Sequence, residues 1–296
     1  MPPRPRPPKR TPKSVVYRRR IVALVVLVAA AAGAWFAVAS VGGNDKKPPP
    51  TPTVVAAPKP FKIVFPEGFT RKQMAARVTA VATIARRERH KDVRLSKRAY
   101  VAATATPRRM PGFGPKRYPL EGFLFPATYD FTRRTTSPQL VAAQLKAFRT
   151  NWEKVDLAYA RSKNLTPYDV LTIASMVEEE TPAPEERQLV SAVIYNRLHA
   201  GMTLGIDAAL RYGLGIPGTE SIHQSQLDNP TPYNLRKHAG LPPTPIGNPG
   251  LASLQAAAHP AKVNYLYFVA KPDKKHHFFT ASSAAFERYK AEHGYK

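Results

Sequence analysis

Three consecutive glutamates, Glu178, Glu179 and Glu180, end an apolar stretch of the chain. The apolar residues before them recur at helical spacing and predict one buried helix face; they are Val170, Ile173, Ala174 and Val177. A helix dipole disfavours anions at the C-terminal end, and Pro182 prevents the helix from continuing normally. At about 100° per residue, Glu179 should point away from the apolar face, whereas Glu178 and Glu180 should flank it.

A carboxyl group beside an apolar face, at a helix end that disfavours its charge, is a candidate for a raised pKa. A general acid needs such a pKa near neutral pH. The spacing does not separate Glu178 from Glu180 in this role. A solvated acidic helix end would explain the same three residues without any catalysis.

Other kinds of catalytic centre have weaker support. The chain has no cysteine, no GxSxG elbow and no HExxH motif. Adjacent His276 and His277 fall on a predicted strand, where neighbouring side chains face opposite sides. Gly213, Gly215 and Gly218 match GxGxxG, but no strand-like run precedes them. We therefore expect no metal site and no cofactor.

The N-terminal part has the composition of a membrane anchor. Residues 1–20 are rich in Arg, Lys and Pro without any acid, which predicts a disordered basic tail in the cytoplasm. Ile21–Val41 is uncharged, apolar and long enough for one transmembrane helix. A signal peptide is the alternative, because Ala37–Ala39 resembles a cleavage site, but the apolar run is too long for one. Residues 42–60 form a Pro-rich linker, so the folded part should be extracytoplasmic.

The net charge of +25 raises the possibility of nucleic-acid binding. The densest basic run, however, is the flank of the predicted transmembrane helix. The predicted folded part lies across the membrane from nucleic acid, where basic charge suits anionic wall polymers and lipid head groups. We therefore expect no nucleic-acid partner, and glycan chemistry by a glutamate fits the compartment better.

The rest of the chain predicts an α+β fold in two parts. Residues 61–105 read as a small module, with a strand at Phe61–Phe65, a turn, and a helix from the Thr70 capping box to about Ala80. Residues 106–296 read as a larger mixed domain. Its expected helices are 137–154, 170–181, 185–198, 251–258 and 282–292, and its expected hairpin pairs 265–270 with 276–281. Gly- and Pro-rich 201–215 and 230–250 are predicted as loops.

Several motifs follow one another in an order that carries a family resemblance. They are Leu120–Tyr129 (LEGFLFPATY), Ala174–Thr181 (ASMVEEET), Val193–Leu198 (VIYNRL), Pro232–Asn234 (PYN), Gly240–Pro243 (GLPP), Ile246–Gly250 (IGNPG), His259-Pro260 and Tyr265–Ala270 (YLYFVA). This pattern, over about residues 106–281, resembles the endolytic murein transglycosylases of the YceG-like family. The 61–105 module resembles that family's LysM-like subdomain in shortened form.

The resemblance implies a membrane-anchored lytic transglycosylase. Such enzymes cut the β-1,4 bond between N-acetylmuramic acid and N-acetylglucosamine in nascent peptidoglycan strands and leave 1,6-anhydromuramoyl ends. The family pattern places the catalytic glutamate directly before Thr181, which is Glu180 here. Polar residues within the matching motifs are expected to bind substrate, with a structural role as the alternative for each: Glu121, Asn196, Arg197, Asp207, Tyr233 and Asn234. The resemblance also implies peptidoglycan synthases as candidate partners.

The chain departs from the family pattern near the site. Gly205-Ile206 stands where a Gln-Thr or Gln-Ser pair often precedes the aspartate, and Ala208 replaces the usual proline. A non-catalytic peptidoglycan-binding scaffold of the cell-wall synthesis machinery is therefore the alternative function. A plain hydrolase that leaves reducing muramic ends is a third.

Overall fold

The computed structural model describes residues 60–295, and their fold is a mostly helical α+β arrangement with small two-stranded sheets. The predicted cytoplasmic tail, transmembrane helix and nearly all of the linker lie outside the described residues. Within 60–295, none of the helices combines the length and the apolar character that a membrane span requires. The mixed α+β fold class expected from the sequence is confirmed for residues 60–295.

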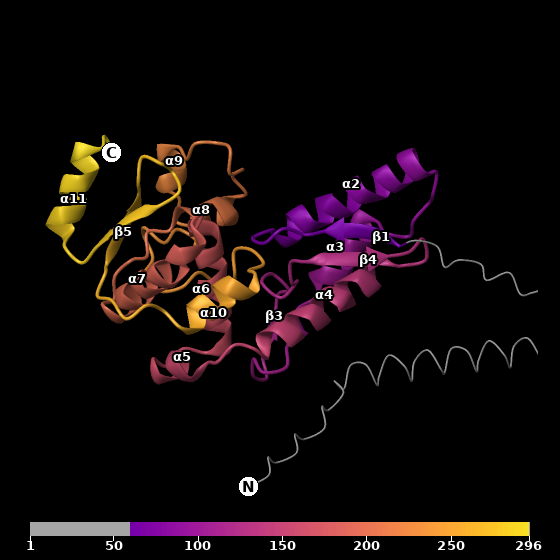
Figure 1. Ribbon diagram of the computed structural model, residues 1–296, viewed down its shortest axis with the longest axis horizontal. Coiled ribbons are helices and arrows are strands. Elements are labelled where there is room, and N and C mark those ends of the chain that lie inside the picture. The colour runs from indigo at the N-terminus through magenta and orange to yellow at the C-terminus, as the bar shows by residue number, and fades with distance from the viewer. Residues whose placement is uncertain (1–59, 296) are drawn as a thin grey trace, which may run out of the picture. The chain divides into compact units, whose positions relative to one another are not determined.

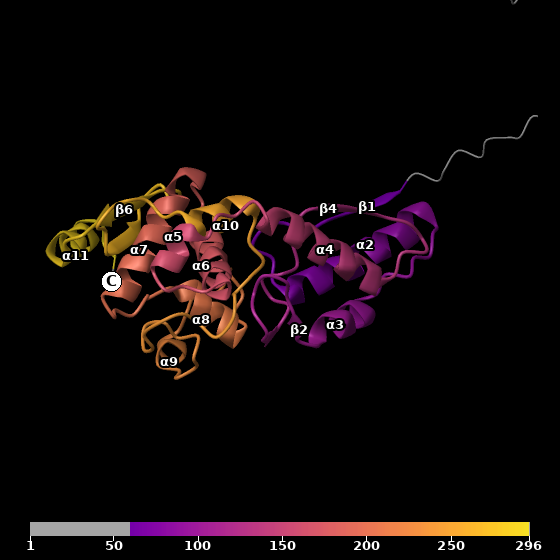
Figure 2. The same ribbon diagram turned by 90° about the horizontal axis from the view of Figure 1, so that it is seen from below.

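The first of two groups of elements combines a two-stranded sheet with three helices (Figures 1 and 2). Strand β1 (Phe61–Val64) pairs antiparallel with β4 (Thr128–Phe131), so that Phe61 lies opposite Phe131. Helix α3 (Lys97–Ala105) packs against both α2 (Arg71–Arg89) and α4 (Ser137–Trp152). In turn, α2 contacts β1 and α4 contacts β4. Because β1 takes its partner from beyond residue 105, the 61–105 segment and the start of the larger predicted domain share one sheet.

Local capping explains where these helices begin. Thr70 and Gln73 form a reciprocal capping box at the start of α2, as the sequence predicts. The prediction that this helix ends near Ala80 is wrong, because it continues to Arg89 and ends at His90 in the left-handed conformation, with φ 49°. Its basic last turn favours this extension, since cations suit the C-terminal end of a helix dipole.

Helix α6 (Pro167–Glu180) packs against α7 (Arg187–His199), α8 (Asp207–Leu214) and α10 (Leu251–Ala258). The short η1 (Pro184–Glu186) packs on α7. Figures 1 and 2 show α6, α7, α8 and α10 grouped together, and the same group includes the short helices α5 (Ala158–Ser162) and α9 (Gln224–Leu227). The four residues of the predicted stripe are all fully buried. The other residues between Val170 and Val177 are buried as well, so α6 is a central helix rather than an amphipathic surface helix.

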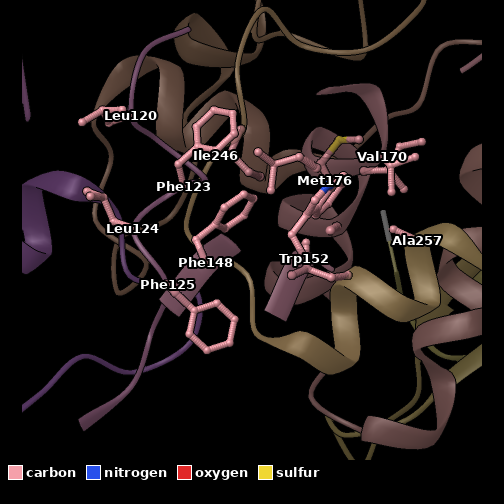
Figure 3. Close-up of a cluster of buried hydrophobic side chains, with 14 of the residues drawn as sticks. Leu120, Phe123, Leu124, Phe125, Phe148, Trp152, Val170, Met176, Ile246 and Ala257 are labelled. Carbon is pink, nitrogen blue, oxygen red and sulfur yellow. The ribbon is translucent and has the colours of Figure 1, made fainter. Parts of the chain in front are cut away.

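One hydrophobic core joins the two groups of helices (Figure 3). The rings of Phe123 and Phe148 meet edge to face at 5.1 Å between centroids, and Phe148 stacks on Trp152 at 5.6 Å. Strands β2 (Arg108–Arg109) and β3 (Arg117–Tyr118) form a small hairpin. Its Tyr118 is partly buried and packs against this core. The core fixes the direction in which α6 points, and therefore the position of its glutamate end.

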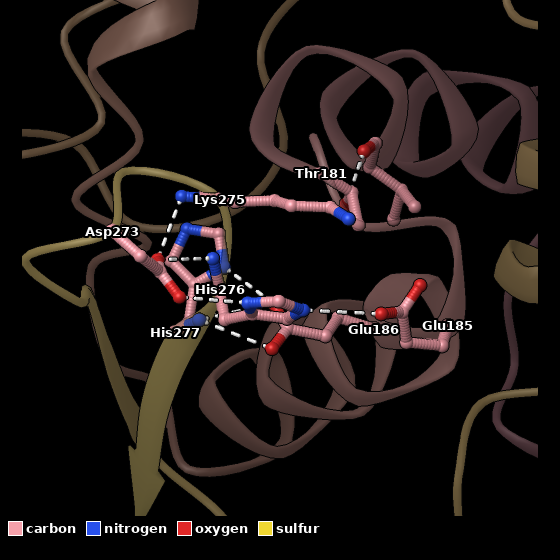
Figure 4. A network of polar contacts seen from close by, with 8 residues as sticks. Thr181, Glu185, Glu186, Asp273, Lys275, His276 and His277 are labelled. Carbon is pink, nitrogen blue, oxygen red and sulfur yellow. Dashed lines mark hydrogen bonds and ion pairs between the residues drawn. The ribbon is translucent and has the colours of Figure 1, made fainter.

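The C-terminal hairpin consists of β5 (Tyr267–Ala270) and β6 (His277–Thr280), followed by α11 (Ser283–Glu292). The predicted hairpin is confirmed, with somewhat shorter strands. A buried contact attaches it to η1: Nδ1 of His277 lies 2.7 Å from Oε2 of Glu186 (Figure 4). His276 instead faces outward, 2.8 Å from Asp273 and 3.2 Å from Glu185.

Candidate active site

Glu180 is the last residue of α6 and lies against the first turn of α8. Burial, followed by the negative charge of Asp207, raises the pKa of the Glu180 carboxyl to about 7. A hydrogen bond from the backbone N–H of Ala208 acts in the opposite direction. The carboxyl group can therefore hold a proton near neutral pH and also release it.

The sequence prediction of a loop over 201–215 is wrong, because these residues include α8. Two glycines gave this segment the sequence pattern of a loop. Gly215 ends it in the left-handed conformation with φ 68°. Gly213 lies inside it, where an added Cβ would come within 2.5 Å of the Tyr233 side chain. The glycine therefore admits a tyrosine from another segment, a reason that no local pattern reveals.

Asp207, the first residue of α8, forms a bidentate ion pair with Arg236. The guanidinium Nε lies 2.7 Å from Oδ1, and Nη2 lies 2.9 Å from Oδ2. Arg236 comes from the Pro-rich 230–250 segment and was not among the residues predicted for the site. No spacing signal in the sequence connects it with Asp207, because the two lie 29 residues apart.

The other two glutamates of the triplet have different surroundings. Glu178 accepts a hydrogen bond from the Gly250 N–H at 2.9 Å and lies 3.7 Å from Nη2 of Arg187. One oxygen of Glu178 thus connects α6 to the start of α10 through a backbone N–H, and the other connects α6 to α7 through a guanidinium. Glu179 is more exposed; desolvation by the surrounding protein and then the charge of Glu178 raise its pKa to about 7.

Glu121 is at the centre of a buried hydrogen-bond network. Its carboxylate accepts from the backbone N–H of Arg71 at 2.8 Å, from Nδ2 of Asn248 at 2.8 Å and from the Tyr212 hydroxyl at 3.1 Å. Burial raises the pKa of Glu121, and these hydrogen bonds oppose the rise. Because Arg71 opens α2 and Tyr212 belongs to α8, Glu121 connects the two groups of helices.

Asn196 and Arg197 attach α7 to the segment before β5. Nδ2 of Asn196 donates to the carbonyls of Val263 at 3.0 Å and Tyr265 at 2.8 Å. Nε of Arg197 donates to the Leu266 carbonyl at 2.6 Å, and burial lowers the pKa of its guanidinium. Asn196 also lines an open cavity of about 560 Å³ with Tyr195 and Tyr265.

Tyr233 and Asn234 shape the loop that carries Arg236. The Tyr233 hydroxyl lies 2.8 Å from Oγ1 of Thr244. Asn234 is fully buried, donates to the carbonyls of Leu227 and Asn229 at 2.8 Å each, and accepts from the Arg236 N–H at 3.2 Å. Among the residues expected from the sequence, the structure thus brings Asp207 to Glu180. Substrate binding by the six polar residues stays a prediction.

A family model described as the YceG-like family matches residues 51–292. The chain belongs to this family. An endolytic murein transglycosylase of Bacillus subtilis is 38% identical over 156 residues, covering 52% of this chain and 43% of the relative. An endolytic murein transglycosylase of Streptococcus pneumoniae is 37% identical over 185 residues, covering 60% of this chain and 33% of the relative. The chain therefore spans only about a third to two fifths of the length of these curated relatives.

The fold of this YceG-like chain is also found in a solved structure. A crystal structure of a YceG-like protein from Listeria monocytogenes superposes with a TM-score of 0.65, at 29% sequence identity. The similarity covers 78% of this chain and 76% of the other. The described arrangement of helices around Glu180 thus lies within a fold shared by YceG-like proteins.

In this YceG-like site, Gly247 allows a close approach between two backbone segments. An added Cβ would collide with the backbone carbonyl oxygen of Gly68 and come within 3.3 Å of Oε1 of Glu179. We expect Gly247→Ala to destabilise the fold by about 2 kcal/mol, because backbone cannot yield as a flexible side chain can. Chemical denaturation measures this. Gly218→Ala is the control, since an added Cβ there meets nothing, and an equal loss in both variants would contradict the argument.

Proposed function

We propose that this protein is a lytic transglycosylase that cleaves peptidoglycan strands internally, with Glu180 as its acid and base. The observation that carries the proposal is the surroundings of Glu180, where burial and Asp207 raise the pKa of the carboxyl to about 7. One residue can give up and regain a proton efficiently only when its pKa lies near the ambient pH. The names of the matched relatives support the reaction class.

In the proposed mechanism, protonated Glu180 donates its proton to the glycosidic oxygen between N-acetylmuramic acid and N-acetylglucosamine. The bond from C1 of the muramic residue to that oxygen breaks, and an oxocarbenium-like centre develops at C1. The Glu180 carboxylate then takes the proton of the C6 hydroxyl, whose oxygen bonds to C1. The products are a 1,6-anhydromuramoyl end and a free 4-hydroxyl, and no water is consumed.

We also propose that residues 21–41 span the cell membrane once, with the N-terminus in the cytoplasm and residues 61–296 outside. The support is the apolar run flanked by Arg18, Arg19 and Arg20. In this view residues 61–105, whose strand β1 pairs with β4, belong to a LysM-like module. Peptidoglycan synthases are the proposed protein partners. Fusion of a periplasmic-type reporter enzyme to the C-terminus tests the orientation: activity outside the cell supports it, and activity confined to the cytoplasm contradicts it.

The reaction is tested with the full-length protein in detergent, incubated with uncrosslinked nascent glycan strands. Mass spectrometry reads the new ends, with Glu180→Gln as the matched control. Anhydro ends from the wild type and none from the variant support the proposal. Reducing muramic ends would indicate a hydrolase instead. Strand binding without cleavage by the wild type would indicate the scaffold function.

A further inference from the structure

A chain of contacts leads from a buried asparagine to Glu180. Asn234 is fully buried and accepts a hydrogen bond from the backbone N–H of Arg236. The Arg236 side chain then contacts both oxygens of Asp207, at 2.7 and 2.9 Å. Asp207 and Ala208 form the turn of α8 that faces Glu180. The position of Arg236 is therefore set by the fold, and it in turn restrains the carboxylate beside Glu180.

The arginines on the helices packed against α6 are engaged elsewhere. Helix α10 (LASLQAAA) carries no charge. On α7, Arg187 is paired with Glu178, and Arg197 donates to backbone carbonyls. On α8, Arg211 donates to the carbonyls of Pro217 and Glu220 at 3.0 and 2.7 Å.

Two further groups of titratable residues lie along the chain on either side of Glu180. Glu185 and Glu186, in η1, contact His276 and His277 of the hairpin. Glu179 precedes Glu180 directly and is itself sensitive to the charge of Glu180. Of the groups on elements packed against α6, Asp207 is thus the charge that acts on Glu180, and Arg236 is the cation that contacts Asp207.

We propose that Arg236 is a positioning residue of this site: by holding both oxygens of Asp207, it sets the charge next to Glu180 and hence the pH range over which Glu180 keeps its proton. A bidentate guanidinium contact fixes the carboxylate plane as well as its distance, which a single ammonium contact does not. The consequence for catalysis rests on the proposed function, in which Glu180 must be protonated to act as the acid.

Substitutions of Asp207 and of Arg236 should shift the pKa of Glu180 in opposite directions. Asp207→Asn removes the negative charge that raises the pKa of Glu180, so this pKa should fall. Arg236→Gln leaves the Asp207 charge uncompensated, so the pKa of Glu180 should rise. Both side chains are about half exposed, with exposed fractions of 41% and 50%, so solvent screens the effect. We expect shifts of roughly half to one unit in each direction.

The first measurement is the rate of strand cleavage by the full-length protein between about pH 5 and 9. Activity is lost as Glu180 loses its proton, so the alkaline limb should move to lower pH in Asp207→Asn and to higher pH in Arg236→Gln. Arg236→Lys should restore part of the wild-type profile. Lys237→Gln removes an equal charge from the adjacent residue, whose amine donates to the Asp228 carbonyl at 2.6 Å, and should leave the limb in place.

The second measurement does not depend on cleavage. Side-chain ¹³C carboxyl NMR of glutamate-labelled protein, with the Glu180 signal assigned by its loss in Glu180→Gln, gives the pKa of Glu180 without substrate. Opposite shifts in the two variants support the inference even if the wild type cleaves no strand, in which case only the proposed function fails. Shifts of the same sign, or none in Arg236→Gln, would overturn it. A purely structural role would lower the rate at every pH and leave the pKa unchanged.

Discussion

Replacing Glu180 with glutamine should lower the rate of strand cleavage by roughly 10²–10⁴-fold. The amide has nearly the same shape as the carboxyl group, but it can neither donate a proton to the glycosidic oxygen nor accept one from the C6 hydroxyl. Affinity for the strand should change little, because the lost interaction belongs to the transition state. Initial rates of anhydro-end formation and a separate binding measurement together test this expectation.

The neighbouring glutamate provides the control for this substitution. The pKa of Glu179 is also raised to about 7, by desolvation and by nearby glutamates. Glu179 lies against Gly68 and Gly247, however, and the family pattern places the acid at Glu180. Glu179→Gln should therefore retain most of the activity. If Glu179→Gln abolished cleavage and Glu180→Gln did not, the acid would have been assigned to the wrong carboxyl group.

The same Glu180→Gln variant should change stability in a pH-dependent way. The pKa of Glu180 is about 7 in the folded protein and about 4.5 in ordinary surroundings. The folded state therefore holds the proton more tightly, so the contribution of Glu180 to stability is greatest below about pH 4.5 and is lost as the pH rises through 7. Glutamine does not titrate. Relative to the wild type, the variant should gain about 1–2 kcal/mol between these limits, measured by denaturation at several pH values.

Asn248→Ala should cause one of the largest losses of stability, about 3 kcal/mol or more. Asn248 is fully buried, accepts from the Leu124 N–H at 2.8 Å, and donates to the Phe69 carbonyl and to Glu121, each at 2.8 Å. Truncation leaves three polar groups without this partner, and the bonds to the Leu124 N–H and to Glu121 are buried. The free energy of unfolding from chemical denaturation provides the measurement.

Two further substitutions separate the network from a general effect of losing an asparagine. Asn151→Ala removes an amide that only bonds the Ala147 carbonyl within its own helix and the Lys154 amine, and it should cost less than about 1 kcal/mol. Asn248→Asp keeps an acceptor for the Leu124 N–H but places a carboxyl beside Glu121. It should be at least as damaging as alanine near neutral pH. Similar losses in Asn151→Ala and Asn248→Ala would contradict the network.

Local patterns in the sequence predicted much of the fold correctly. The capping box at Thr70, the buried residues of α6 and helix α10 at Leu251–Ala258 all depend on neighbours within a turn or two, so they are visible in the sequence. The prediction of a loop over 201–215 failed because a tertiary contact explains a residue that looks like a helix breaker. Helix α8 was hidden by Gly213, whose missing side chain makes room for Tyr233. The transmembrane helix over 21–41 stays a prediction.

The sequence by itself determined the family of this protein and the helix that ends in three glutamates. The family resemblance pointed to Glu180 as the acid, and the tertiary structure decided what surrounds each of the three glutamates. Glu178 is held by Gly250 and Arg187, whereas Glu180 faces Asp207. The structure also revealed Arg236, since its partner Asp207 lies 29 residues away in the chain. The physical reason is that a carboxyl pKa responds to burial and to charges within a few ångströms, and only the folded chain brings these together.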